Sequence, residues 1–147
     1  MKKILLLMLA IVVSLSFTGV AMAANPPNLI GTWSGTVHFV IWNNISSQFS
    51  YTDLVFTYEI QDQDPDTGNF YGLDNSLPPF PFTGNVATNK IVTIIEYFTA
   101  GEFRIFTGKV TGKKISGTVQ HFHPDQIDTG TFILYKQQVP TLDGSTE

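Results

Sequence analysis

Apolar and polar side chains alternate with a period of two along the first part of the chain. From Gly31, one face of the pattern carries Trp33, Val37, Phe39 and Ile41, and the other carries Thr32, Ser34, Thr36 and His38. The stretch 51–61 repeats the alternation, with Leu54, Phe56, Tyr58 and Ile60 on its apolar face. Because successive side chains of a strand point to opposite sides, the pattern predicts two half-buried strands, which we expect to pair.

Closely spaced turn residues divide the rest of the chain into shorter segments. The strands expected there are 70–73, 82–87, 91–98, 103–110, 115–123 and 131–136. After residue 23 no apolar repeat of 3.6 residues persists, so no substantial helix is expected. The sequence therefore predicts an all-β fold, an antiparallel up-and-down meander of roughly eight strands that closes into a barrel, because closure removes both exposed sheet edges.

The first 23 residues have the pattern of a secretory signal peptide. Lys2 and Lys3 precede an apolar run, and Ala21-Met22-Ala23 supplies the small residues of a cleavage site before Ala24. We therefore expect a signal peptide over 1–23 and a single barrel domain over 24–147, with a polar tail from about 137. The expected location is secreted or periplasmic, without stable membrane insertion after cleavage.

Composition and charge narrow the class of partner. The 147 residues include no Cys, and 12 Asp and Glu outnumber 8 Lys and Arg, for a formal net charge of −4. An acidic surface argues against a nucleic-acid partner, because phosphate contacts need clustered basic side chains. Without Cys, the domain depends on its hydrophobic core and not on disulfides.

Two short motifs at the ends of the predicted sheet resemble a known group of proteins. Leu29-Ile30-Gly31-Thr32-Trp33 and Gly130-Thr131-Phe132 look like the first and last strands of small secreted calycin-type barrels, the lipocalin and avidin superfamily. The resemblance implies an up-and-down barrel with a packed or ligand-holding interior and a Trp that closes one end. It extends to secreted bacterial barrels of uncharacterised function, and it implies no particular activity.

The function predicted first is non-enzymatic binding of a small apolar or aromatic molecule in the barrel lumen or mouth. The residues expected to contact it are Trp33, Phe39, Phe56, Tyr58, Phe106, His121, His123 and Phe132. If these side chains fill the lumen, a solid barrel with a surface interaction role is the alternative. Further aromatic residues expected beside the loops, as a mouth or as plugs, are Trp42, Phe49, Tyr51, Tyr71, Phe80 and Phe82.

The spacing of His121 and His123 places both imidazoles on the apolar face of one predicted strand. Such a pair suits Zn or Cu, with a third ligand from Asp125, Asp128 or another strand, whereas His38 is expected to point outward. The alternative is that both imidazoles lie hydrated at the barrel rim. With an acidic partner, the same pair also allows a metal-dependent or acid–base enzyme.

Two other groups of acidic residues are candidates for a cation site or a general base. Asp62, Asp64 and Asp66 alternate in one turn-rich segment, which suits Ca²⁺ or a solvated acidic turn. Glu96 alternates with apolar residues, but we expect it to reach solvent, with an inward general base as the alternative. There is no Cys and no Gly-x-Ser-x-Gly motif, so no catalytic residue is assigned and no cofactor is required, with Zn or Ca as alternatives.

Overall fold

The structure is a computed structural model that describes residues 24–43, 48–99 and 101–138. The signal peptide predicted over 1–23 and residues 139–147 of the predicted tail lie outside these ranges. No helix among the described residues is long and apolar enough to cross a membrane.

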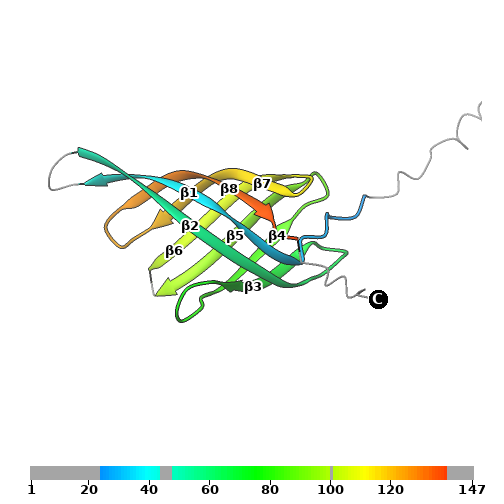
Figure 1. Cartoon of the computed structure of the whole chain (residues 1–147). Helices are drawn as coiled ribbons and strands as arrows, with labels where there is room; N and C mark the ends of the chain where they lie inside the picture. Colours follow the sequence, from blue (N-terminus) through cyan, green and yellow to red (C-terminus); the bar gives the residue numbers. More distant parts are fainter. Residues whose placement is uncertain (1–23, 44–47, 100, 139–147) are drawn as a thin grey trace, which may run out of the picture.

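Eight antiparallel strands follow one another around a closed barrel, each bonded to its neighbour in the sequence, and β8 pairs back with β1 (Figure 1). The predicted meander and its closure are confirmed, as is the pairing of the first two strands. The strands are β1 (Gly31–Asn43), β2 (Gln48–Gln63), β3 (Asn69–Asp74), β4 (Pro81–Val86), β5 (Ile91–Thr99), β6 (Glu102–Thr111), β7 (Lys114–Phe122) and β8 (Ile127–Lys136).

The alternation of side chains along the strands builds a single core inside the barrel. Trp33 of β1 lies opposite Tyr58 of β2, and Val37 lies opposite Phe132 of β8, so the apolar faces of neighbouring strands coincide. All four of these side chains are almost fully buried. The interior is therefore formed by every second side chain of each strand, as the period of two requires.

The two barrel ends differ in their connections. At one end, which we call the mouth, are the β1–β2, β3–β4, β5–β6 and β7–β8 connections. At the other end, the base, are the remaining three turns and the lead-in segment 24–30. At the base, the Trp33 indole Nε1 donates a hydrogen bond to the Leu29 carbonyl at 2.7 Å, and both residues are 1% exposed.

A bulge in β2 brings a polar side chain into the base. The pairing of β2 with β3 shifts register between Ile60 and Asp62, so the next inward residue is Gln63. Its side chain accepts a hydrogen bond from the Leu29 backbone N–H at 2.7 Å and donates one to the Pro27 carbonyl at 2.9 Å. The bulge therefore fixes the lead-in across the base.

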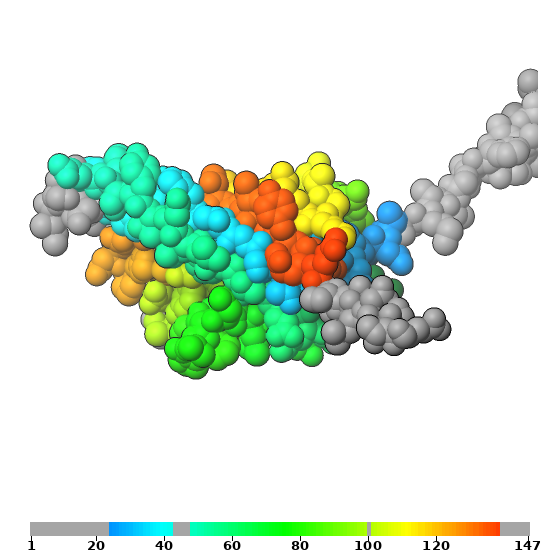
Figure 2. All heavy atoms as spheres, in the orientation of Figure 1, coloured from blue at the N-terminus to red at the C-terminus, as the bar shows by residue number. Residues whose placement is uncertain are grey.

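β1 and β2 extend past the rest of the barrel at the mouth. β8 pairs with β1 only as far as Val40, and β3 pairs with β2 only from Tyr58 onward. Residues 41–43 and 48–50 consequently pair only with each other, and residues 51–57 pair with β1 but with no strand on their other side. Together, residues 41–43 and 48–57 extend the β1–β2 hairpin past its neighbours. We call this two-stranded segment the ribbon, and Figure 2 shows it in cyan and teal, projecting beyond the body of the barrel.

Candidate functional site

Three potential metal ligands meet at the mouth. Glu102 begins β6, His121 is near the end of β7, and His123 follows β7 directly. Nε2 of His121 lies 3.2 Å from Oε1 of Glu102, and Nδ1 of His123 lies 3.7 Å from the same oxygen. One ligand atom from each residue falls within 4.8 Å of the others. Two nitrogens and one oxygen are donors of the kind that three-ligand zinc sites use.

A fourth side chain orients His123. Oδ2 of Asp128, near the start of β8, lies 3.1 Å from Nε2 of His123, and its Oδ1 accepts a hydrogen bond from the Gln126 side chain at 3.0 Å. Because a carboxylate only accepts hydrogen bonds, Nε2–H of His123 donates to Asp128, and the lone pair of Nδ1 in the neutral ring then faces Glu102. Metal-binding histidines are commonly held by a carboxylate in this way.

Burial and neighbouring charge keep the mouth imidazole of His121 neutral. Loss of hydration, with smaller effects from the Arg104 guanidinium and His123, lowers the pKa of His121 to about 4, and Glu102 opposes this shift. The side chain of His123 is 29% exposed and that of Glu102 is 33% exposed. The cluster is thus protected on its inner side and open to solvent on its outer side.

Beneath the cluster lies a buried polar group of three residues. Nη1 of Arg104 in β6 lies 3.5 Å from Oε2 of Glu96 in β5, and Tyr58 of β2 lies close to Glu96. Burial raises the pKa of Glu96 to about 7, and burial with the Glu96 charge raises that of Tyr58 well above its usual value. Among the described residues, the Tyr58 hydroxyl, Oε1 of Glu96 and Nε of Arg104 have no hydrogen-bond partner.

The expected solvent exposure of Glu96 is wrong, because its side chain is fully buried. The physical reason is Arg104, which pairs directly across the β5–β6 hairpin and compensates part of the cost of burying a carboxyl group. The guanidinium also lies over three aromatic rings, with its carbon 4.4 Å from the centroid of Phe98, 5.1 Å from Phe56 and 5.8 Å from Phe39.

The side chains predicted to contact a ligand in the lumen lie inside the barrel and pack on one another. The ring of Phe106 lies 5.8 Å from Tyr58, 6.2 Å from Phe56 and 5.3 Å from Phe132. Trp33 is at the base, whereas Phe39 is near the mouth, 6.1 Å from the His121 ring. The middle of the barrel is therefore occupied by aromatic rings, and the polar groups gather at the mouth.

The remaining histidine and acidic candidates lie elsewhere. His38 is on the outer face of β1, where it pairs with Asp53 and stacks on Tyr51 at 5.8 Å. Asp125 is exposed in the β7–β8 turn, and no hydrogen bond or ion pair links it to the mouth cluster.

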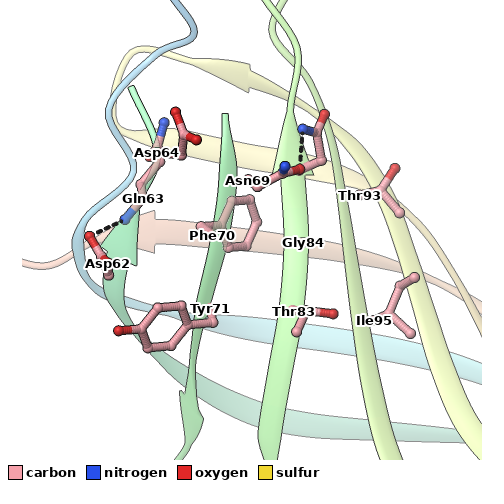
Figure 3. Close-up of a pocket in the computed structure, with 11 residues that line it drawn as sticks. Asp62, Gln63, Asp64, Asn69, Phe70, Tyr71, Thr83, Gly84, Thr93 and Ile95 are labelled. Carbon is pink, nitrogen blue, oxygen red and sulfur yellow. Dashed lines mark hydrogen bonds between the residues drawn. The ribbon is translucent and has the colours of Figure 1, made fainter. Parts of the chain in front are cut away.

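Asp62, Asp64 and Asp66 lie at the β2–β3 connection and form no cluster of ligands; among the described residues, only the mouth group has the spacing of a metal site. The Asp64 carboxylate accepts the backbone N–H groups of Thr67 and Asp66, which lower its pKa, and Asp62 accepts that of Gln63. These carboxylates therefore cap the turn. Asp62 and Asp64 border a shallow hollow of about 540 Å³ on the outer face of β2–β5, together with Tyr71, Thr83 and Asn85 (Figure 3).

The expected aromatic cluster beside the loops divides into separate groups. Phe82 is 1% exposed and belongs to the core, because its ring points into the barrel and packs on Tyr58, with ring centroids 5.0 Å apart. Trp42, Phe49 and Tyr51 are exposed on the ribbon. Phe80 packs on Phe98 at the mouth, with ring centroids 5.0 Å apart, and Tyr71 is exposed on β3.

Sequence reasoning missed Glu102 and Arg104 as members of the mouth. The sequence did contain a sign of their position. Glu96 and Arg104 are equally far from the turn expected near residue 100, so they face each other across the hairpin, and Glu102 begins the strand that follows the turn. Neither a known protein family nor a curated protein matches the chain.

Proposed function

We propose that this protein is a non-enzymatic binding barrel that holds a divalent transition-metal ion at its mouth. The observation that carries the proposal is the convergence of Glu102, His121 and His123 from two neighbouring strands, with ligand atoms within 4.8 Å of one another. Imidazole nitrogen and carboxylate oxygen suit Zn²⁺, and the same donors bind Cu²⁺.

Three features of the surroundings support the proposal. Asp128 holds His123 in the tautomer that presents Nδ1 to the ion. The partial exposure of Glu102 and His123 gives the ion a path from solvent. The positive charge of Arg104 opposes a cation, but the guanidinium is paired with Glu96 and shielded by the rings around it.

The test is a calorimetric titration of the purified protein with Zn²⁺ after treatment with a chelator. The wild type is expected to bind one ion per chain, and His121→Ala, His123→Ala and Glu102→Gln are each expected to weaken binding by roughly tenfold or more. His38→Ala is the matched control, because His38 is on the outer face and should leave binding unchanged. Absence of binding in the wild type, or an equal loss in the control, would contradict the proposal.

A small apolar or aromatic molecule is a second candidate ligand for the same end of the barrel. The rings of Phe39 and Phe98 lie 6.1 and 5.7 Å from the His121 ring, and Phe80 packs on Phe98. Native mass spectrometry tests this candidate: an adduct that survives chelation supports it, and a bare chain argues against it.

We further propose that the barrel is calycin-like and exported. The Gly31-Thr32-Trp33 motif opens β1, and Trp33 is buried at the base, as the resemblance to calycin-type barrels implies. Export predicts that the mature protein begins at Ala24. Mass spectrometry of the protein recovered from the secreted and periplasmic fractions tests this prediction, and an intact Met1 would contradict it.

A further inference from the structure

The outer edge of β2 lacks a neighbouring strand over much of its length. β2 pairs with β1 from Gln48 to Ile60 but with β3 only from Tyr58 to Gln63. Within the described part of the chain, residues 48–56 are therefore bonded on one side only. The free part of this edge ends at Thr57, whose backbone N–H donates a hydrogen bond to the Asn75 side chain at 3.2 Å.

The Thr57 hydrogen bond shows which backbone groups face away from β1. Because backbone N–H and C=O groups alternate in direction along a strand, those of Val55, Asp53, Tyr51 and Phe49 point the same way as those of Thr57. Four successive pairs of donors and acceptors thus form a row along the free edge. Such a row is a template for pairing with another strand.

The side chains along this edge are apolar and exposed. Phe49 is 62% exposed, Tyr51 is 66% exposed and Val55 is 77% exposed, and the Trp42 ring packs 4.8 Å from Phe49. Single exposed apolar residues are common on protein surfaces, but a row of them along a free strand edge is not.

The usual protection of an edge strand is missing here. No Lys, Arg or Pro occurs between residues 48 and 58, and no bulge interrupts the pairing of the ribbon. The one charged side chain in this stretch outside the core, Asp53, is paired with His38. Each copy of this acidic chain therefore carries only one acidic side chain between residues 48 and 58, which limits the repulsion between two copies at this edge.

We propose that the free edge of β2 pairs antiparallel with the same edge of a second copy of this chain. An antiparallel edge is complementary to itself under a two-fold axis, so the two ribbons would form one continuous four-stranded sheet. Contact through Trp42, Phe49, Tyr51 and Val55 would bury roughly 450 Å² of side-chain surface per copy. The backbone along the edge adds to this area, and a typical stable interface buries roughly 800 Å² per partner.

Light scattering coupled to size-exclusion chromatography, over a wide range of protein concentration, tests the proposal. The wild type is expected to form a closed dimer. Val55→Pro removes an edge donor without breaking a bond to β1, and Tyr51→Lys places a charge on the edge. Each variant is expected to raise the dimer dissociation constant by roughly tenfold or more. Tyr97→Lys is the matched control, because Tyr97 is 58% exposed on β5, and this variant should dimerise like the wild type.

Hydrogen exchange provides a measurement that does not depend on variants. The amides of Phe49, Tyr51, Asp53 and Val55 are expected to gain protection as the concentration rises, while other exposed amides do not. A wild type that remains monomeric, open-ended larger assemblies, edge variants that dimerise normally, or an equal loss in Tyr97→Lys would each overturn the proposal.

Discussion

Glu96 and Arg104 face each other across the β5–β6 hairpin inside the barrel, with Nη1 of Arg104 3.5 Å from Oε2 of Glu96. The carboxyl group is fully buried, and its Oε1 has no partner among the described residues. Burial raises the pKa of Glu96 to about 7, so the protonated and ionised forms of this carboxyl group are both populated near neutral pH.

This burial predicts a pH-dependent effect of Glu96→Gln on stability. In the unfolded chain the carboxyl group loses its proton near pH 4.5, whereas in the folded barrel it does so near pH 7. Its contribution to stability is therefore fully present below pH 4.5 and is lost as the pH rises to about 7, a change of about 3 kcal/mol. Relative to the wild type, Glu96→Gln should gain about that amount over this range.

Urea unfolding of both proteins at several pH values measures this difference. The comparison with the wild type is essential, because the lowered pKa of His121 adds stability as the pH rises and so opposes the effect of Glu96. A difference between the two proteins that does not change with pH would show that Glu96 is ionised normally in the barrel.

Asp128→Asn should weaken binding of Zn²⁺ at the mouth. The substitution keeps the shape of the side chain but removes the charge that holds Nε2 of His123 at 3.1 Å. Loss of such an orienting carboxylate commonly costs roughly tenfold to a hundredfold in metal affinity. Competition with a chelator gives the affinity. The control is Asp125→Asn, because Asp125 is exposed in the adjacent β7–β8 turn, and this variant should bind Zn²⁺ like the wild type.

Gln63→Met should loosen the lead-in from the base. The variant leaves the Leu29 backbone N–H and the Pro27 carbonyl without their side-chain partners, at a cost of about 1–3 kcal/mol. Faster hydrogen exchange at the Leu29 amide would report the change locally. Gln61→Met, at an exposed position of the same strand, should leave both exchange and stability unaltered.

Gly84→Ala should destabilise the barrel by about 1–3 kcal/mol through overpacking. A Cβ at this position of β4 would overlap the ring of Phe70 in β3 and the Thr93 carbonyl of β5. Thr83→Ala, at the neighbouring exposed position, removes atoms without adding any and serves as the control. Equal unfolding midpoints in denaturant for the two variants would show that the Phe70 ring yields without cost.

The alternation of apolar and polar residues was sufficient to predict the barrel, because the inward and outward side chains of its strands alternate with the same period of two. It was not sufficient for Gln63, because a bulge changes the direction of the side chains after Ile60 and leaves no mark in the sequence. The candidate site was partly predictable, because His121 and His123 are two residues apart and come together at the mouth, although β7 ends at Phe122, before His123. The place of Glu102 in the site could not be predicted, because it depends on the register of the β5–β6 hairpin, which shifts between Tyr97 and Thr99.

Both ends of the described chain leave the barrel at its base. The lead-in crosses the base at Leu29, and the backbone N–H of Gln137, just after β8, donates to the Thr32 carbonyl at 2.8 Å. An anchor, tag or solid support joined directly before Ala24 or after Gln138 would therefore start at the end of the barrel opposite Glu102, His121 and His123. Tethered in this way, the protein would present the mouth, where we propose that an ion binds, and the ribbon outward, to solution.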